Sequence, residues 1–206
     1  NSAHKVLDPF CGTGTTIVEC KKLGIPSVGI EASSLAHFAG QVKIDWSTDP
    51  DELLKHSYTI AEDALAYLEQ DGIVDNPVFI QEHLPQVQLR RLEPEVDKLL
   101  LANSLSPLPL HKALVLRECI EKHRNTRYFK HQLLAFGNAL TFSISNLHFG
   151  PEVGVGTLKK DTPVVEAWLD NIRQMAHDLR QLRPHNGTPA MIYHADSREI
   201  SDFIEP

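Results

Sequence analysis

This sequence of 206 residues has little cysteine, no long apolar run and no excess of positive charge. Cys11, Cys20 and Cys119 are odd in number and widely spaced, which excludes a disulfide framework and a paired-cysteine zinc site. The eleven histidines show no His-Glu-x-x-His spacing, so we predict no metal site. No apolar stretch reaches the ~18 residues that a membrane-spanning helix needs. The net charge of −7 excludes a histone-like polycation.

The composition that remains, 42% hydrophobic and 23% charged, is typical of a globular protein. The N-terminal residues lack the charged-then-apolar pattern of a secretory leader, so we expect a reducing, cytoplasmic location. There is no initiator Met, and a strand-like run follows closely on Asn1. We therefore expect the chain to be a segment of a longer protein.

The first 47 residues predict alternating strands and helices. A short apolar strand at 4–8 is followed by a turn-rich loop, a helix that ends at Gly24, and a strand at 27–31. A second helix begins at Ser33 or Ser34. This alternation predicts an α/β fold with a parallel sheet and right-handed crossovers.

The middle of the chain has a helical pattern instead. Helices are expected at about 49–71, 80–102, 111–123 and 128–147, followed by a loop at 150–156. A long amphipathic helix from about 161 and a strand at 190–193 return to the α/β pattern. We therefore predict a first core part at 1–47, a helical insert at 48–160 and a return to the core at 161–206. Trp46 and Trp168 are expected in the core.

A glycine-containing loop and an acid follow the first two predicted strands. Gly12 and Gly14 permit a tight turn and a close approach of the backbone to a ligand, and the next helix offers free N–H groups to an anion. Glu31, at the tip of the second strand, is placed to accept hydrogen bonds from ribose hydroxyls. The pattern predicts a site for a nucleoside-containing ligand.

Two common nucleotide motifs do not fit this loop. The dinucleotide fingerprint requires a third glycine where Ile17 stands, and the Walker loop requires a lysine, of which none occurs before Lys21. The stretch Asp8–Thr16 (DPFCGTGTT) instead resembles motif I of the DNA methyltransferases that modify exocyclic amino groups of adenine or cytosine. VGIEAS at 28–33 is similar to their motif II, and ADSRE at 195–199 to their motif III.

The resemblance implies a Rossmann-like core that binds S-adenosyl-L-methionine. In such families the loop backbone and the two threonine hydroxyls hold the methionine end, the motif II acid binds the ribose, and the motif III acid meets the adenine amino group. An acid such as Asp8 suits the ammonium group. The candidate cofactor-binding residues are Asp8, Pro9, Phe10, Cys11, Gly12, Thr13, Gly14, Thr15, Thr16, Glu31, Ala32, Asp196 and Ser197. Cys11 is expected to be a small buried side chain and not a nucleophile.

These methyltransferases also carry a Pro-Pro-Tyr-type catalytic segment, and this sequence has no Pro-Pro pair. We therefore assign no catalytic residue and expect that the chain by itself does not transfer methyl groups. The parent is expected to be a DNA methyltransferase, with the catalytic loop beyond this segment. An RNA methyltransferase acting on transfer-RNA guanine, or a non-catalytic binding module, remains an alternative.

A basic stretch at 111–131 contrasts with the acidic remainder. It holds six Lys and Arg against two Glu, a net of +4, which leaves −11 for the other residues. Arg117, Arg124 and Arg127 are candidates for nucleic-acid phosphate contacts. The alternative is a solvated helix with an ion pair between Arg117 and Glu121.

Overall fold

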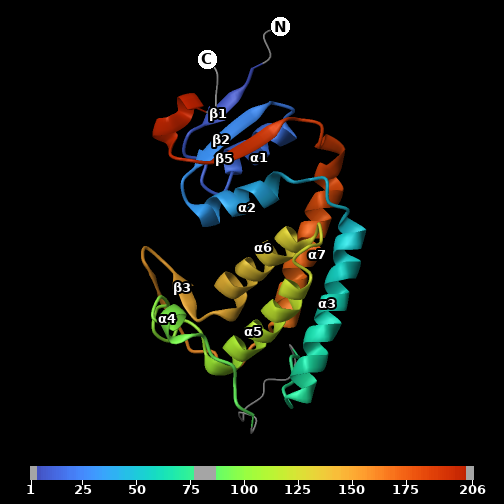
Figure 1. Cartoon of the computed structure of the whole chain (residues 1–206), viewed down its shortest axis with the longest axis vertical. Helices are drawn as coiled ribbons and strands as arrows, with labels where there is room; N and C mark the ends of the chain where they lie inside the picture. The colour runs from blue at the N-terminus through green and yellow to red at the C-terminus, as the bar shows by residue number, and fades with distance from the viewer. Residues whose placement is uncertain (1–3, 77–86, 203–206) are drawn as a thin grey trace. The chain divides into compact units, whose positions relative to one another are not determined.

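The computed structural model describes residues 4–76 and 87–202 (Figure 1). The chain forms two compact units: unit 1 comprises residues 1–50 and 177–206, and unit 2 comprises residues 51–176. The domain borders inferred from the sequence stay a prediction. None of the helices in the described part of the chain is long and apolar enough to cross a membrane.

Unit 1 is built on a three-stranded parallel sheet in the order β1-β2-β5 (Figure 1). The strands are β1 (Val6–Asp8), β2 (Ser27–Glu31) and β5 (Ala190–His194), and β2 pairs with both of the others. The expected strand–loop–helix–strand order is confirmed, with α1 (Thr15–Lys22) and α2 (Ser34–Ile44) as the helices. The α/β prediction thus holds for this unit.

The helices of unit 1 bury one face of the sheet. Cys11, Ile17, Ile44 and Ile192 form an apolar cluster there. On the opposite face, Leu7, Val28 and Met191 share one row across the three strands. Leu7 is 44% exposed and Met191 51% exposed, so in the described structure this second face is only partly covered.

Two side chains from α2 contact a backbone carbonyl oxygen on the outer edge of β5. The Gln41 amide nitrogen donates to the carbonyl oxygen of Ile192 at 2.9 Å, and the His37 Nε2 atom lies 3.1 Å from the same oxygen. These contacts occupy a backbone acceptor that would otherwise be available to another strand.

Unit 2 is mainly helical. Its elements are α3 (Pro50–Gln70), the short α4 (Pro94–Asp97), α5 (Pro107–Lys122), α6 (Phe129–Ala139), the π-helix η1 (Leu140–Ile144) and α7 (Val165–Leu182), whose last residues belong to unit 1. Proline at the start of α3, α4 and α5 fits a first helical turn, where no intrahelical N–H bond is lost. Trp168 is fully buried in this unit and Trp46 is 1% exposed in unit 1, as predicted.

Two segments of unit 2 differ from the sequence-based predictions. The sequence predicts a helix over 80–102, but among its described residues only α4 is α-helical, and residues 77–86 lie outside the described part. Pro94 begins this short helix, because a residue that precedes proline is disfavoured in helical conformation. The predicted loop at 150–156 is instead the end of a hairpin, formed by β3 (Leu147–Phe149) and β4 (Val153–Val155).

A buried charge network ties distant parts of unit 2 together. The Lys112 ammonium on α5 lies 2.7 Å from Asp161 Oδ1 and 3.2 Å from Asp75 Oδ1, with all three side chains at most 2% exposed. Asp75 also accepts backbone N–H bonds from Val164 and Val165 at the start of α7. One carboxylate thus pairs with α5 and caps α7.

Replacing Lys112 by Met should destabilise unit 2 by about 3–5 kcal/mol, because two buried carboxylates are left without their cation. Since each unit holds one of the two tryptophans, urea unfolding of a Trp46→Phe background reports on unit 2 through Trp168. The matched control is Lys130→Met, which removes an exposed cation in the same unit. Equal unfolding midpoints for the two variants would contradict a stabilising role for the network.

Candidate functional site

The loop between β1 and α1 turns through two left-handed glycines. Gly12 has a φ of 54° and Gly14 a φ of 83°, conformations that a side chain would strain. Gly14 is the N-cap of α1 and has no side chain with which to cap it. The first N–H groups of the helix, from Thr15 and Thr16 onward, are thereby suited to a carboxylate.

Glu31, at the end of β2, holds the glycine loop. Its Oε2 atom accepts the N–H of Gly12 at 2.9 Å, and its Oε1 atom accepts the N–H of Ser33 at 2.7 Å. A carboxylate has about four lone-pair positions, so each oxygen retains an acceptor site after these bonds. Glu31 can therefore position the loop and still accept hydrogen bonds from a ligand.

The loop packs closely on β2 and α2 because glycines face it. A Cβ atom at Gly29 would lie 2.6 Å from the Cys11 sulfur, and one at Gly14 would lie 3.2 Å from the Gly40 Cα. Cys11 is buried, and its N–H donates to the Ile30 carbonyl at 3.1 Å. Burial, together with the nearby carboxylates of Asp8 and Glu31, raises the Cys11 pKa to about 11. The prediction of a small buried side chain is confirmed, and the thiol stays protonated at neutral pH.

The side chains of the other loop residues, in contrast to Cys11, are exposed or half-buried. Asp8, the last residue of β1, accepts the N–H of Phe10 at 3.1 Å, while the Phe10 side chain is 78% exposed. Pro9 lies between them in the turn. The Thr13 hydroxyl accepts a hydrogen bond from the Lys43 ammonium at 2.9 Å. Partial desolvation of its ammonium group lowers the pKa of Lys43, an exposed residue on α2 that the sequence motif did not indicate.

The segment after β5 brings a third acid to the same edge of the sheet. The N–H of Ala195 donates to the Glu31 carbonyl at 3.2 Å, which fixes the chain just before Asp196. Asp196 accepts bonds from the backbone N–H and the guanidinium of Arg198, and these bonds lower its pKa to about 2. Ser197 begins the short 3₁₀ helix η3 (Ser197–Asp202).

Two histidines near this edge were not indicated by the motifs. The rings of His37 and His194 stack with centroids 5.0 Å apart, and His194 Nε2 lies 3.1 Å from the Ala32 carbonyl oxygen. They link the start of α2 to the end of β5. Only the spatial pairing of β2 with β5 brings them together, since 157 positions separate them in the sequence.

The comparisons with known proteins agree with this part of the chain. Residues 1–37, which include the glycine loop and Glu31, match the profile of a family described as DNA methylase. A stretch of 44 residues is 44% identical to the type II methyltransferase M.MjaII of Methanocaldococcus jannaschii. That stretch is 21% of this chain and 8% of the relative, so the chain spans a small fraction of that protein. No solved structure matches the chain.

Gly29→Ala should destabilise unit 1 by about 1–3 kcal/mol, because the new methyl group overlaps the Cys11 side chain. Urea unfolding in a Trp168→Phe background follows unit 1 through Trp46. Adding Cys11→Ala to the variant should restore part of the stability by removing the overlapping sulfur. Gly187→Ala, at an open position with ordinary φ, is the control. If Gly29→Ala destabilises unit 1 no more than the control does, the close contact between Gly29 and Cys11 does not contribute to stability.

Proposed function

We propose that this chain is the S-adenosylmethionine-binding part of a DNA methyltransferase acting on an exocyclic amino group of adenine or cytosine. The observation that carries the proposal is the Glu31 carboxylate, which bonds to the glycine loop and retains acceptor sites beside an uncapped helix N-terminus. These residues lie within the part that matches the DNA methylase family. That match favours DNA chemistry over a transfer-RNA methyltransferase and over a non-catalytic module.

The donor and acceptor set at this edge fits each part of the cofactor. The N–H groups from Thr15 onward suit the methionine carboxylate, and Asp8 suits the ammonium. Glu31 suits the ribose hydroxyls, and Asp196 the adenine amino group. When bound, S-adenosylmethionine would supply an electrophilic methyl group on a sulfonium. The chain's residues would contribute by holding that cofactor in a fixed position toward the target amine.

In the proposed complex the adenine amino group would replace the Arg198 guanidinium, which bonds to both oxygens of the Asp196 carboxylate in this structure. The Arg198 side chain is 88% exposed, so it can move away without vacating a buried position. Its departure leaves a carboxylate free to accept a bond from an amino group. The geometry around Asp196 is therefore compatible with a ligand that takes the place of Arg198.

Glu31→Gln should weaken the binding of S-adenosylmethionine, and of its demethylated product, by about ten- to a hundredfold, because a charged acceptor is removed. Titration calorimetry with the whole chain measures this change. Glu19→Gln, which removes an exposed acid paired with Lys22 on α1, is the control and should leave affinity unchanged. Equal affinities for Glu31→Gln and the unaltered chain would refute the ribose assignment.

DNA is the proposed second partner. In the structure, only some of the basic residues in the stretch 111–131 are available to contact it. Lys112 is buried in its ion network and contributes no surface charge. Lys122 contacts the Tyr67 hydroxyl and lies 3.8 Å from Glu118. The Arg117–Glu121 ion pair of the alternative interpretation is not among the ion pairs of the described residues, where Glu118 pairs with Arg90. The positive charge that this stretch can offer to a phosphate is thus smaller than the net charge of +4 counted from its sequence.

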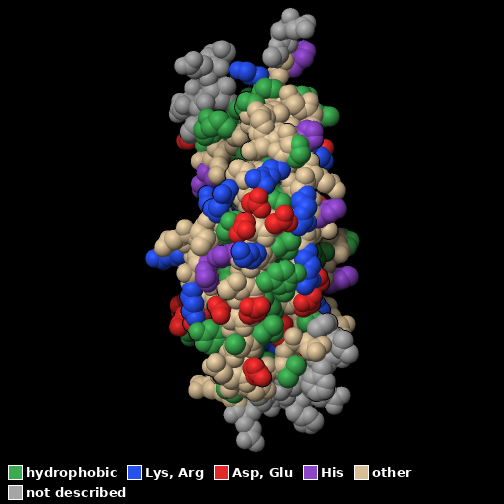
Figure 2. Space-filling view, turned by 90° about the vertical axis from the view of Figure 1, so that its right-hand side faces the viewer, with side chains coloured by type: hydrophobic (Ala, Val, Ile, Leu, Met, Phe, Trp, Pro, Cys, Tyr) green, Lys and Arg blue, Asp and Glu red, His purple; other side chains and the backbone are tan. Residues whose placement is uncertain are grey.

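Arg117, Arg124 and Arg127 are all exposed. Arg124 follows the end of α5, and Arg127 lies against the Tyr128 ring before α6 begins. Cations at the end of a helix also stabilise its dipole, so a structural role competes with phosphate binding. On the face shown in Figure 2, basic and acidic side chains are intermingled, and the described residues there form no patch of one sign.

Replacing Arg124 and Arg127 together by Gln should lower the salt dependence of duplex binding. The slope of log affinity against log salt concentration should fall by roughly 0.9 for each phosphate that the variant no longer neutralises. Filter binding with the whole chain gives the slope, and Lys22→Gln is a control on α1 of unit 1. If the slope of the double variant equals that of the control, neither Arg124 nor Arg127 neutralises a phosphate.

A further inference from the structure

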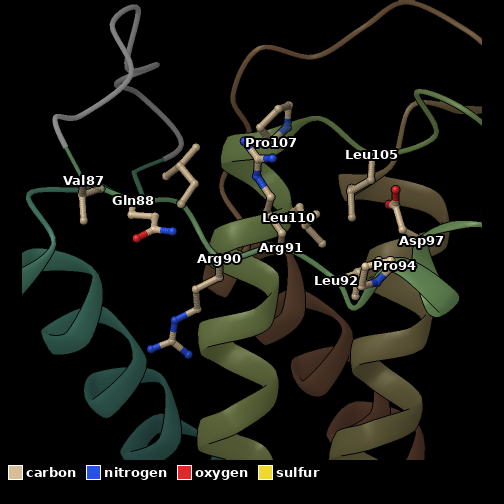
Figure 3. A pocket seen from close by; sticks show the side chains of 11 residues that line it. Val87, Gln88, Arg90, Arg91, Leu92, Pro94, Asp97, Leu105, Pro107 and Leu110 are labelled. Carbon is tan, nitrogen blue, oxygen red and sulfur yellow. The ribbon is translucent and has the colours of Figure 1, made fainter.

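Residues 87–105 of unit 2, here named the strap, lie across the first turns of α5. Figure 3 shows the beginning and end of the strap beside Pro107 and Leu110, with Arg90 and Arg91 pointing in different directions. Apart from α4 the described strap has no α-helix or strand, and Leu99, at 83% exposed, extends into solvent. The strap therefore covers α5 without close packing, and hollows remain along it.

One of these hollows is an apolar cavity of about 300 Å³. It is about twice the ~150 Å³ cavity that suffices for one benzene molecule. The strap, α5, α6, η1 and β3 all contribute to its wall, which includes Leu92, Leu100, Leu110, Leu114, Phe136 and Leu147.

Two of the hydroxyl groups in this wall, those of Thr141 and Ser145, already make hydrogen bonds to the backbone. The Thr141 hydroxyl donates to the Gly137 carbonyl at 2.8 Å, and the Ser145 hydroxyl donates to the Thr141 carbonyl at 2.9 Å. A nucleobase buried here would leave several donors and acceptors unpaired, at considerable cost. The wall thus favours a hydrocarbon body over a base.

Arg117 adds a positive charge to the cavity wall. It lines both this cavity and the adjoining hollow that Arg90 and Arg91 share. Arg90 pairs with Glu118, whereas Arg117 has no hydrogen-bond or ion-pair partner among the described residues. An exposed guanidinium beside an apolar cavity is complementary to an anionic group attached to an apolar body.

We propose that this cavity binds a small ligand with an apolar body of about two fused rings and one carboxylate or similar anion. The body fills the space between the strap and α5, and the anion pairs with Arg117. This site lies wholly within unit 2 and does not depend on the cofactor site of unit 1. The proposal is therefore independent of the proposed binding of S-adenosylmethionine, and it assigns Arg117 to this ligand instead of to a DNA phosphate.

The probe is naphthalene-2-carboxylate, with naphthalene-2-carboxamide as its uncharged counterpart and deoxyadenosine monophosphate as the nucleotide alternative. Affinities for the whole chain are measured by titration calorimetry. The carboxylate should bind about tenfold more tightly than the amide, because it forms one charge-assisted hydrogen bond with Arg117 that the amide cannot form. Arg117→Gln should remove that difference, and Lys98→Gln, a nearby exposed cation paired with Glu95, should leave it unchanged.

A second variant tests the cavity itself. Ala113→Leu places additional carbon atoms in the wall and should abolish binding of both naphthalene probes, with the urea midpoint showing that unit 2 remains folded. Equal binding of carboxylate and amide, insensitive to Arg117→Gln, would overturn the anionic assignment. Tighter binding of the nucleotide would overturn the apolar class. Absence of binding by any probe at millimolar concentration would overturn the site.

Discussion

The central strand β2 pairs in parallel with β1 on one side and β5 on the other, and the candidate site depends on this pairing. Because parallel strands end at the same edge, Asp8 and Glu31 from the first 31 residues lie on the same side of the sheet as Asp196, which is 165 positions further along the sequence. The bond from Gly12 to Glu31 and the bond from Ala195 to the Glu31 backbone then join the three strand ends. Glu31 thus takes part in the architecture as well as in the proposed chemistry.

The features that could be predicted from the sequence depend on short stretches of chain. The strand, glycine loop, helix and acid at 4–31 follow from local turn chemistry and apolar patterning, and the same residues match the DNA methylase family. The buried position of Trp168 follows from helical periodicity, whereas Trp46 is buried as predicted but lies two residues beyond the end of α2. Each of these features depends on residues that are close in the sequence or on a repeating hydrophobic pattern.

The features that were missed depend on distant partners. Lys112 looks like one more surface cation until folding brings Asp75 and Asp161 to it from opposite sides of the sequence. The hairpin at 147–155 is an exception, because Leu147 and Val155 are only eight positions apart; its glycine and proline indicate a turn but not that paired strands flank the turn. The stacking of His37 on His194 requires β5 to lie beside β2. Contacts between residues far apart in the sequence cannot be predicted from composition or hydrophobic periodicity.

The two outer strands of the described sheet in unit 1 differ in what they offer to another polypeptide. At β5, a newcomer would have to displace Gln41 and His37 from the Ile192 carbonyl. At β1, the described residues place no comparable side-chain contacts on the backbone, and the neighbouring Leu7 is partly uncovered. Among the described residues, the backbone of β1 is therefore more accessible to a further strand than the Ile192 carbonyl of β5.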